Sequence, residues 1–161
     1  MVSESVHVKP HRYEARVTWS GASEGATESY ESYSRDWTAE LPAKPPLRGS
    51  ADRTFRGDMT LFNPEDLLVV ALSTCHLLSY LALCARAKIP VVGYVDEAQG
   101  TMTLHEGKIR FTEVVLRPRV SIASGDPKRA LELHEKAHAE CFIANSVNFP
   151  VRHDATVEVL R

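Results

Sequence analysis

The feature that most limits how this chain can fold is a long apolar segment, residues 67–85, in which His76 is the only side chain able to carry a charge. A segment of this length fits either a transmembrane helix or a core helix of a globular protein. Serine, threonine, histidine and tyrosine interrupt it, and it stands alone in the sequence. These properties favour a core helix, so we expect no membrane partner.

The residues at the start of this segment predict where the helix begins. In NPEDLLVVALSTCHLLSYLALCAR, residues 63–86, Asn63 suits the N-cap and Pro64 the first helical position. The acid Glu65 favours the positive end of the helix dipole. Pro90 is incompatible with a continuing helix, which is therefore expected to end at about Ala87.

The rest of the chain alternates between strand and helix patterns and predicts a single domain over residues 1–161. Strands are expected at residues 11–19, 27–37, 91–104, 109–122 and 155–160, with an ordered connection at residues 41–59 and a second helix that starts at Asp126 and Pro127 and runs to residue 146. The expected fold class is α+β, with an antiparallel sheet wrapped on a long buried central helix.

The apolar helix also predicts the oligomeric state. A helix that is apolar on every side needs cover on every side. One small sheet from a chain of 161 residues leaves part of such a helix bare. The simplest cover is a second copy of the chain, so we expect a homodimer.

Charge and cysteine content narrow the partners and the compartment. The chain has 19 basic and 21 acidic residues, which gives no electrostatic argument for a nucleic-acid partner. The N-terminal sequence MVSESVHVKP has no apolar signal region, so a cytoplasmic location is expected. Three cysteines argue against a disulfide framework and leave reactive, metal-binding or buried thiols.

Two of the thiols lie in the apolar helix. Cys84 follows Cys75 by nine residues and so falls on the opposite side of the helix, where an inert buried thiol is expected. Cys75 itself could be equally inert. Its neighbour His76 is expected to pack with one satisfied nitrogen. Glu65 lies ten residues before Cys75, about three turns away, so the two cannot touch within one straight helix.

A second cluster, HEKAHAEC, occupies residues 134–141. His134, Glu135 and His138 match the H-E-x-x-H pattern of zinc hydrolases, and Cys141 falls on the same helical face as His134. The pattern fixes only three positions, and no third ligand of the usual kind follows. A solvated helix edge is the favoured interpretation, and neither a metal nor a cofactor is expected.

Together the two clusters resemble a known family. FNPEDLLVVALSTCH, followed some 65 residues later by AHAECFIANSV, resembles the OsmC/Ohr family of organic hydroperoxide reductases. The resemblance implies an intertwined homodimer with active sites at the subunit interface. It implies that Cys75 is the peroxidatic thiolate, oxidised to a sulfenic acid, and that Cys141 then forms a disulfide with it. An external dithiol would reduce that disulfide.

The resemblance also implies an activating arginine held by Glu65. Thr54 occupies the family's arginine position, and in an extended chain Arg56 projects to the same side. Arg56 is therefore the first candidate, Arg53 the second, and Arg35 a distant third.

Two positions depart from the family pattern. Phe142 stands where proline usually follows the second cysteine, and His76 stands where an apolar aromatic residue is common. His76 could act as a polar lid or proton donor, or simply pack. The alternative function is therefore a non-catalytic protein that binds a small hydrophobic ligand at the dimer interface, and a zinc hydrolase is third.

Overall fold

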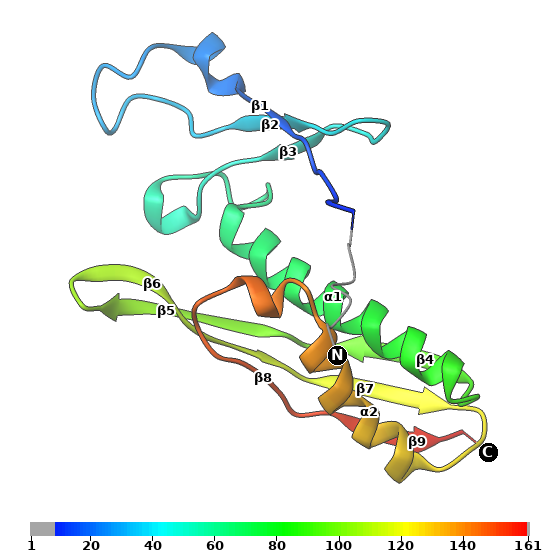
Figure 1. Cartoon of the computed structure of the whole chain (residues 1–161). Helices are drawn as coiled ribbons and strands as arrows, with labels where there is room; N and C mark the ends of the chain where they lie inside the picture. Colours follow the sequence, from blue (N-terminus) through cyan, green and yellow to red (C-terminus); the bar gives the residue numbers. More distant parts are fainter. Residues whose placement is uncertain (1–8, 161) are drawn as a thin grey trace, which may run out of the picture. The chain divides into compact units, whose positions relative to one another are not determined.

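The computed structural model describes residues 9–160, shown in Figure 1. The chain forms two compact units, one ending at Pro64 and one beginning at Glu65. Each unit is described by itself below. The assignment of one domain to residues 1–161 stays a prediction.

The first unit contains a three-stranded antiparallel sheet in the order β1-β2-β3. Its elements are β1 (Arg16–Trp19), the 3-10 helix η1 (Ser20–Glu24), β2 (Trp37–Glu40), β3 (Leu47–Gly49) and the 3-10 helix η2 (Arg53–Phe55). The antiparallel pairing of the first two strands is confirmed, although β1 is shorter than residues 11–19.

The predicted strand at residues 27–37 is wrong. Only Trp37 belongs to a strand, and the preceding residues form turns and bends. Ser32 bonds through its hydroxyl to both the N–H and the carbonyl of Ser29, which closes a local turn in place of a sheet ladder. These short-range bonds outweigh the strand propensity of the aromatic residues.

The second unit contains both long helices and six strands, with the strands running alongside the helices in Figure 1. Its elements are α1 (Pro64–Arg86), β4 (Val91–Asp96), β5 (Gln99–His105), β6 (Lys108–Leu116), β7 (Pro118–Ile122), α2 (Pro127–Glu140), η3 (Ala144–Ser146), β8 (Val151–His153) and β9 (Thr156–Val159). The start of α1 at Pro64 is confirmed, and its end lies one residue before the predicted one.

The strands of this unit form two sheets, ordered β4-β7-β9 and β5-β6-β8. The expectation of a purely antiparallel sheet is wrong, because β8 pairs parallel to β6 and β9 parallel to β7. Strand β8 was not predicted. Its three residues are too few to show a period, and its partner strand is distant in sequence.

Helix α2 begins as predicted and ends early. The Asp126 carboxylate accepts the N–H of Lys128 at 2.9 Å, the usual N-cap bond. The predicted continuation to residue 146 is wrong, because α2 ends at Glu140 and Cys141 adopts an extended conformation as the C-cap. The side chain of Asn145 donates to the carbonyl of Cys141 at 3.0 Å and so satisfies a group that a continuing helix would have used.

The main core joins the two helices to the sheet. Its buried members are Tyr80, Leu83 and Cys84 of α1, Ala130, Leu133 and Ala137 of α2, and Ile89, Val120 and Ile122. One face of α2 therefore packs against α1 and the sheet.

Within a single chain, α1 is buried along one face only. Its fully buried residues are Leu72, His76, Tyr80, Leu83 and Cys84. By contrast, Val70 is 53 % and Leu78 66 % exposed. By length and composition alone, α1 is apolar enough to cross a membrane, but one such helix is weak evidence, because core helices of globular proteins have the same property.

Candidate functional site

The structure brings together two of the three cysteines. Cys75 lies in the middle of α1 and Cys141 caps the C-terminus of α2, and the two thiols are close enough for Cys75 to shift the pKa of Cys141. Both are reduced. Cys75 is partly exposed and Cys141 is buried, so a molecule in solvent meets Cys75 first.

The surroundings of Cys141 favour a protonated thiol. Burial is the main cause that raises the pKa of Cys141 to about 11, and the neighbouring Cys75 thiol acts in the same direction. The N–H of Ala144 donates to Cys141 Sγ at 3.4 Å and opposes this shift. At neutral pH, Cys141 therefore holds its proton.

Cys84 lies apart from this pair. It is buried in the main core, and burial raises the pKa of its thiol, opposed by the nearby Tyr80 side chain. A protonated thiol with 1 % exposure is a poor nucleophile. The structure is consistent with the inert role predicted for Cys84.

Glu65, in the first turn of α1, has an unsatisfied atom. Its Oε2 is buried and has no hydrogen-bond partner among residues 9–160. A buried carboxylate oxygen that accepts no hydrogen bond costs folding free energy. We therefore expect a hydrogen-bond donor at this atom. A guanidinium is the donor best matched to a carboxylate.

The candidate arginines Arg53 and Arg56 lie in the first unit, both exposed. The predicted extended chain is wrong here, since η2 spans Arg53 to Phe55 and Arg56 follows it in the left-handed region at φ 66°. The argument that Arg56 replaces Thr54 on the same side of a strand therefore fails. The choice of Arg56 over Arg53 stays a prediction.

Arg35 is committed elsewhere. Its guanidinium lies 3.8 Å from the ring centre of Tyr33 and also stacks on Tyr30, and it donates to the carbonyls of both tyrosines. These contacts hold the side chain within its own loop. They agree with its third place among the candidates.

The H-E-x-x-H pattern does not form a solvated helix edge. His134 is 1 % exposed, and its Nδ1 lies 2.9 Å from Nε2 of His76 on α1. Glu135 is exposed, and its carboxylate lies 3.5 Å from Nε2 of His153. Over residues 9–160, no group of three histidine, cysteine or acidic side chains is placed to hold a metal ion.

His76 packs with one satisfied nitrogen, as expected. Its Nε2 bonds to His134 while its Nδ1 has no hydrogen-bond partner within the described part of the chain. Burial is the main cause that lowers the pKa of His76 to about 4 and that of His134 to about 3. Both imidazoles are therefore neutral at physiological pH.

Sequence reasoning missed the residues around this pair. The ring of Tyr80 stacks on His134 at 3.8 Å, and His153 lies 5.5 Å from His76 between ring centres. The spacing of His76 and Tyr80, one turn apart on one helical face, was the available signal. Nothing in the sequence indicates His153, which reaches the cluster from the unpredicted strand β8.

A carboxylate fixes the turn of α1 that precedes Cys75. Asp96, at the end of β4, accepts the hydroxyl of Ser73 at 2.5 Å and the backbone N–H of Arg117 at 2.6 Å. Because Ser73 lies two residues before Cys75, these bonds tie the thiol-bearing part of α1 to the sheet.

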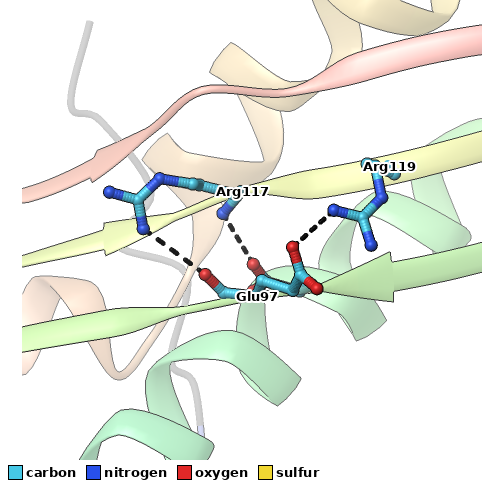
Figure 2. Close-up of polar contacts among 4 residues, drawn as sticks. Glu97, Arg117 and Arg119 are labelled. Atoms are coloured by element: carbon cyan, nitrogen blue, oxygen red, sulfur yellow. Dashed lines mark hydrogen bonds and ion pairs between the residues drawn. The ribbon is translucent and has the colours of Figure 1, made fainter.

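Two arginines next to this carboxylate are engaged by Glu97. Figure 2 shows Arg117 donating to the Glu97 carbonyl at 3.4 Å and Arg119 donating to its carboxylate at 2.5 Å. The Arg119 pair is exposed on both sides, so it contributes little to stability. Both guanidinium groups therefore donate to Glu97.

The fold is α+β, and its two long helices carry the two neighbouring free thiols. These features place the protein among small α+β proteins with a pair of cysteines at one site. Residues 57–156 match the family model described as OsmC-like protein, and the chain belongs to this family. The resemblance drawn from the two sequence clusters is thus confirmed, and so is the α+β OsmC-like fold.

Similar proteins include two solved structures. The chain is 31 % identical to an OsmC-like protein of unknown function from Vibrio cholerae, with a TM-score of 0.81 over 91 % of this chain and 99 % of that chain. It is 16 % identical to an organic hydroperoxide resistance protein OsmC from Legionella pneumophila, with a TM-score of 0.66 over 94 % of this chain and 99 % of that chain.

A third relative is known from its sequence. The chain is 23 % identical over 103 residues to the uncharacterized protein YmaD from Bacillus subtilis, which covers 60 % of this chain and 69 % of that protein.

Proposed function

We propose that this protein is a thiol-dependent peroxidase that reduces organic hydroperoxides to alcohols. The observation that carries the proposal is the meeting of two reduced thiols from different helices, the partly exposed Cys75 and the buried Cys141. Membership of the OsmC-like family, and structural similarity to a hydroperoxide resistance protein, support the substrate class.

The proposed cycle has three steps. The Cys75 thiolate attacks the terminal oxygen of the hydroperoxide, the O–O bond breaks, and the alkoxide takes a proton and leaves as the alcohol. Sulfur has then lost two electrons and is a sulfenic acid. Cys141 attacks this sulfur, a disulfide forms, and the hydroxyl leaves as water with the Cys141 proton. An external dithiol returns two electrons and restores both thiols.

This cycle has a direct experimental test. Purified protein with a dithiol reductant such as dihydrolipoamide should consume cumene hydroperoxide, measured by peroxide loss over time. After one equivalent of the hydroperoxide without reductant, mass spectrometry of the alkylated digest should show a Cys75–Cys141 link. Absence of both would overturn the proposal. A cytoplasmic location, where dithiol reductants persist, belongs to the same proposal.

The proposed cation at Cys75 is Arg56, with Arg53 as second candidate. A nearby positive charge favours the nucleophilic thiolate form of a cysteine, and the unpartnered Oε2 of Glu65 is suited to hold a guanidinium. We expect Arg56→Met to lower kcat/KM for cumene hydroperoxide by about a hundredfold and to slow the alkylation of Cys75 by iodoacetamide.

The alkylation rate of Cys75 at pH 7, followed by mass spectrometry, measures this effect directly. Arg53→Met is the matched variant, since Arg53 is an equally exposed arginine of the same segment. An effect in Arg53→Met alone would transfer the role to Arg53. If both variants behave like the wild type, neither arginine activates Cys75.

We further propose that the exposed face of α1 is covered by a second copy of the chain. Leu78 is 66 % exposed one turn after Thr74 on a helix that is apolar throughout. Leu78→Glu should convert a dimer to a monomer in light scattering, because a buried unpaired charge costs several kcal/mol, roughly. Leu104→Glu, at a leucine with similar exposure on β5, is the control and should leave the dimer intact. A monomeric wild type would contradict the proposal.

A non-catalytic role is the second candidate function. It is favoured by Phe142, which follows Cys141 and is 81 % exposed, and by similarity to a family member of unknown function. A large exposed aromatic ring beside the thiols suits contact with a hydrophobic ligand. Native mass spectrometry that finds a co-purified small molecule, together with no turnover of any hydroperoxide, would favour this function over catalysis.

A further inference from the structure

The two helices that carry the thiols are joined by a buried pair of imidazoles. His76 directly follows Cys75 on α1, and His134 lies two turns before Cys141 on α2. The two side chains are 0 % and 1 % exposed, and Nε2 of His76 lies 2.9 Å from Nδ1 of His134. Both imidazoles are neutral at physiological pH, so one of these two nitrogens carries a hydrogen and donates a hydrogen bond to the other.

The geometry of this hydrogen bond is close to ideal. The ring centres are 5.2 Å apart and the ring planes differ by 6°. A centre separation of this size is near the maximum that a 2.9 Å contact allows, so the bond points along the line joining the two centres. The rings therefore lie edge to edge in one plane, with the N–H aimed at the lone pair of its acceptor.

The other contacts between the helices are less directional. Around the pair, α1 and α2 meet through apolar side chains such as Leu83, Leu133 and Ala137. Apolar packing depends mainly on buried area and permits small displacements, whereas a linear hydrogen bond fixes distance and direction. Tyr80 also stacks on the His134 ring at 3.8 Å with planes 12° apart, which restrains that ring.

We propose that His76 and His134 are positioning residues. Their hydrogen bond fixes the distance between α1 and α2 near the thiols, and this distance determines the effective concentration of Cys141 at Cys75. The inference rests on the proposed function in that the disulfide would be its catalytic intermediate. Disulfide geometry has narrow limits on the separation of the two Cα atoms. A displacement of about 1 Å can cost up to about a hundredfold in the reaction of two positioned groups.

Two nearly identical substitutions at one position provide the test. In His76→Gln the amide falls where Nε2 lies and can still bond to His134, while in His76→Asn the shorter side chain places the amide near Nδ1 and cannot reach. Both variants bury the same polar group, so a general loss of stability affects them alike. At His134, where Nδ1 makes the bond, Asn is the substitution expected to preserve it.

The measurement is the equilibrium of the Cys75–Cys141 disulfide with a dithiothreitol redox buffer at pH 7, read by alkylation and mass spectrometry. We expect His76→Asn to lower the equilibrium constant for disulfide formation at least about tenfold, which raises the reduction potential by about 30 mV. His76→Gln and His134→Asn should stay within about threefold of wild type. Leu83→Ala truncates an apolar contact between the same two helices, two turns beyond His76, and should reduce thermal stability without this change.

Equal constants for His76→Gln and His76→Asn would overturn the inference, as would a fall in Leu83→Ala as large as that in His76→Asn. A wild type that forms no Cys75–Cys141 disulfide in the redox buffer would overturn it as well. The redox buffer needs no peroxide, so the proposed function is tested separately. If the disulfide forms in the buffer but hydroperoxides are not consumed, the positioning role stands and the peroxidase proposal fails.

Discussion

Replacing Cys75 with serine is expected to lower the turnover of cumene hydroperoxide by at least about a thousandfold. The reason is that the reaction needs a thiolate to attack oxygen, and a serine hydroxyl is neither ionised at neutral pH nor comparably nucleophilic. Cys75 is also the more exposed sulfur of the pair, so no equally accessible thiol replaces it. The measurement is the rate of peroxide loss with excess dithiol.

Two companion variants separate this effect from a general loss of a cysteine. Cys84→Ser removes a buried thiol on the same helix and should leave kcat/KM within about threefold of wild type in the fraction that remains folded. Cys141→Ser should consume one equivalent of hydroperoxide rapidly and then slow down, since the sulfenic acid has lost its protein partner. Unchanged turnover in Cys75→Ser would refute the peroxidase mechanism.

The reduced protein is expected to lose roughly 6 kcal/mol of folding stability when the pH falls from 7 to 4, about half from each buried imidazole. Burial holds the pKa of His76 at about 4 and that of His134 at about 3, against an ordinary value of 6.5. Below pH 6.5 these two histidines are protonated in the unfolded chain but remain neutral in the folded chain. The free energy of unfolding therefore decreases as the pH is lowered. Above this window both states are neutral and the loss is absent.

Other ionisable groups surround the pair and modify this dependence. They are Tyr80, Glu135, His138, Tyr94, His153 and Asp154. Burial lowers the pKa of His153, opposed by the nearby carboxylate of Glu135, so His153 adds to the loss in the same direction. The phenols of Tyr80 and Tyr94 have raised pKa values and stay protonated throughout the range.

Urea unfolding at several pH values between 4 and 7.5 measures this loss. The control is the double variant His76→Gln/His134→Asn, whose amides can bond at the same positions but do not titrate. Its stability should fall less over the same range, and the difference between the two proteins isolates the imidazole pair. Parallel curves for the variant and the wild type would show that the pair does not cause the acid sensitivity.

Elements that depend on neighbouring residues were predictable from the sequence. Proline at the first position of α1 and the carboxylate of Asp126 at the start of α2 act within one turn, and both helix starts were correct. The ends were less accurate. Helix α2 stops at Glu140 because Asn145, from beyond the helix, bonds to the carbonyl groups of its last turn.

Strand pairing and the first unit were harder to predict. Serine bonds within residues 29–32 replace a predicted strand by a turn. The parallel partners β8 and β9 are placed by their pairing with β6 and β7, which a local pattern does not encode. Such pairings are decided by the whole sheet, since each short strand gains its hydrogen bonds only from a distant neighbour.

The sequence by itself determined the family, the helix starts and the two candidate thiols, because capping residues and cysteine spacing are local properties. Only the tertiary structure decided that Cys75 meets Cys141 and that His134 is buried against His76, 58 residues away in the chain. From the sequence alone, the H-E-x-x-H pattern was interpreted as either a solvated helix edge or a metal site. Its first histidine is instead half of a hydrogen bond whose other half is supplied by a different helix, and no local pattern records that packing.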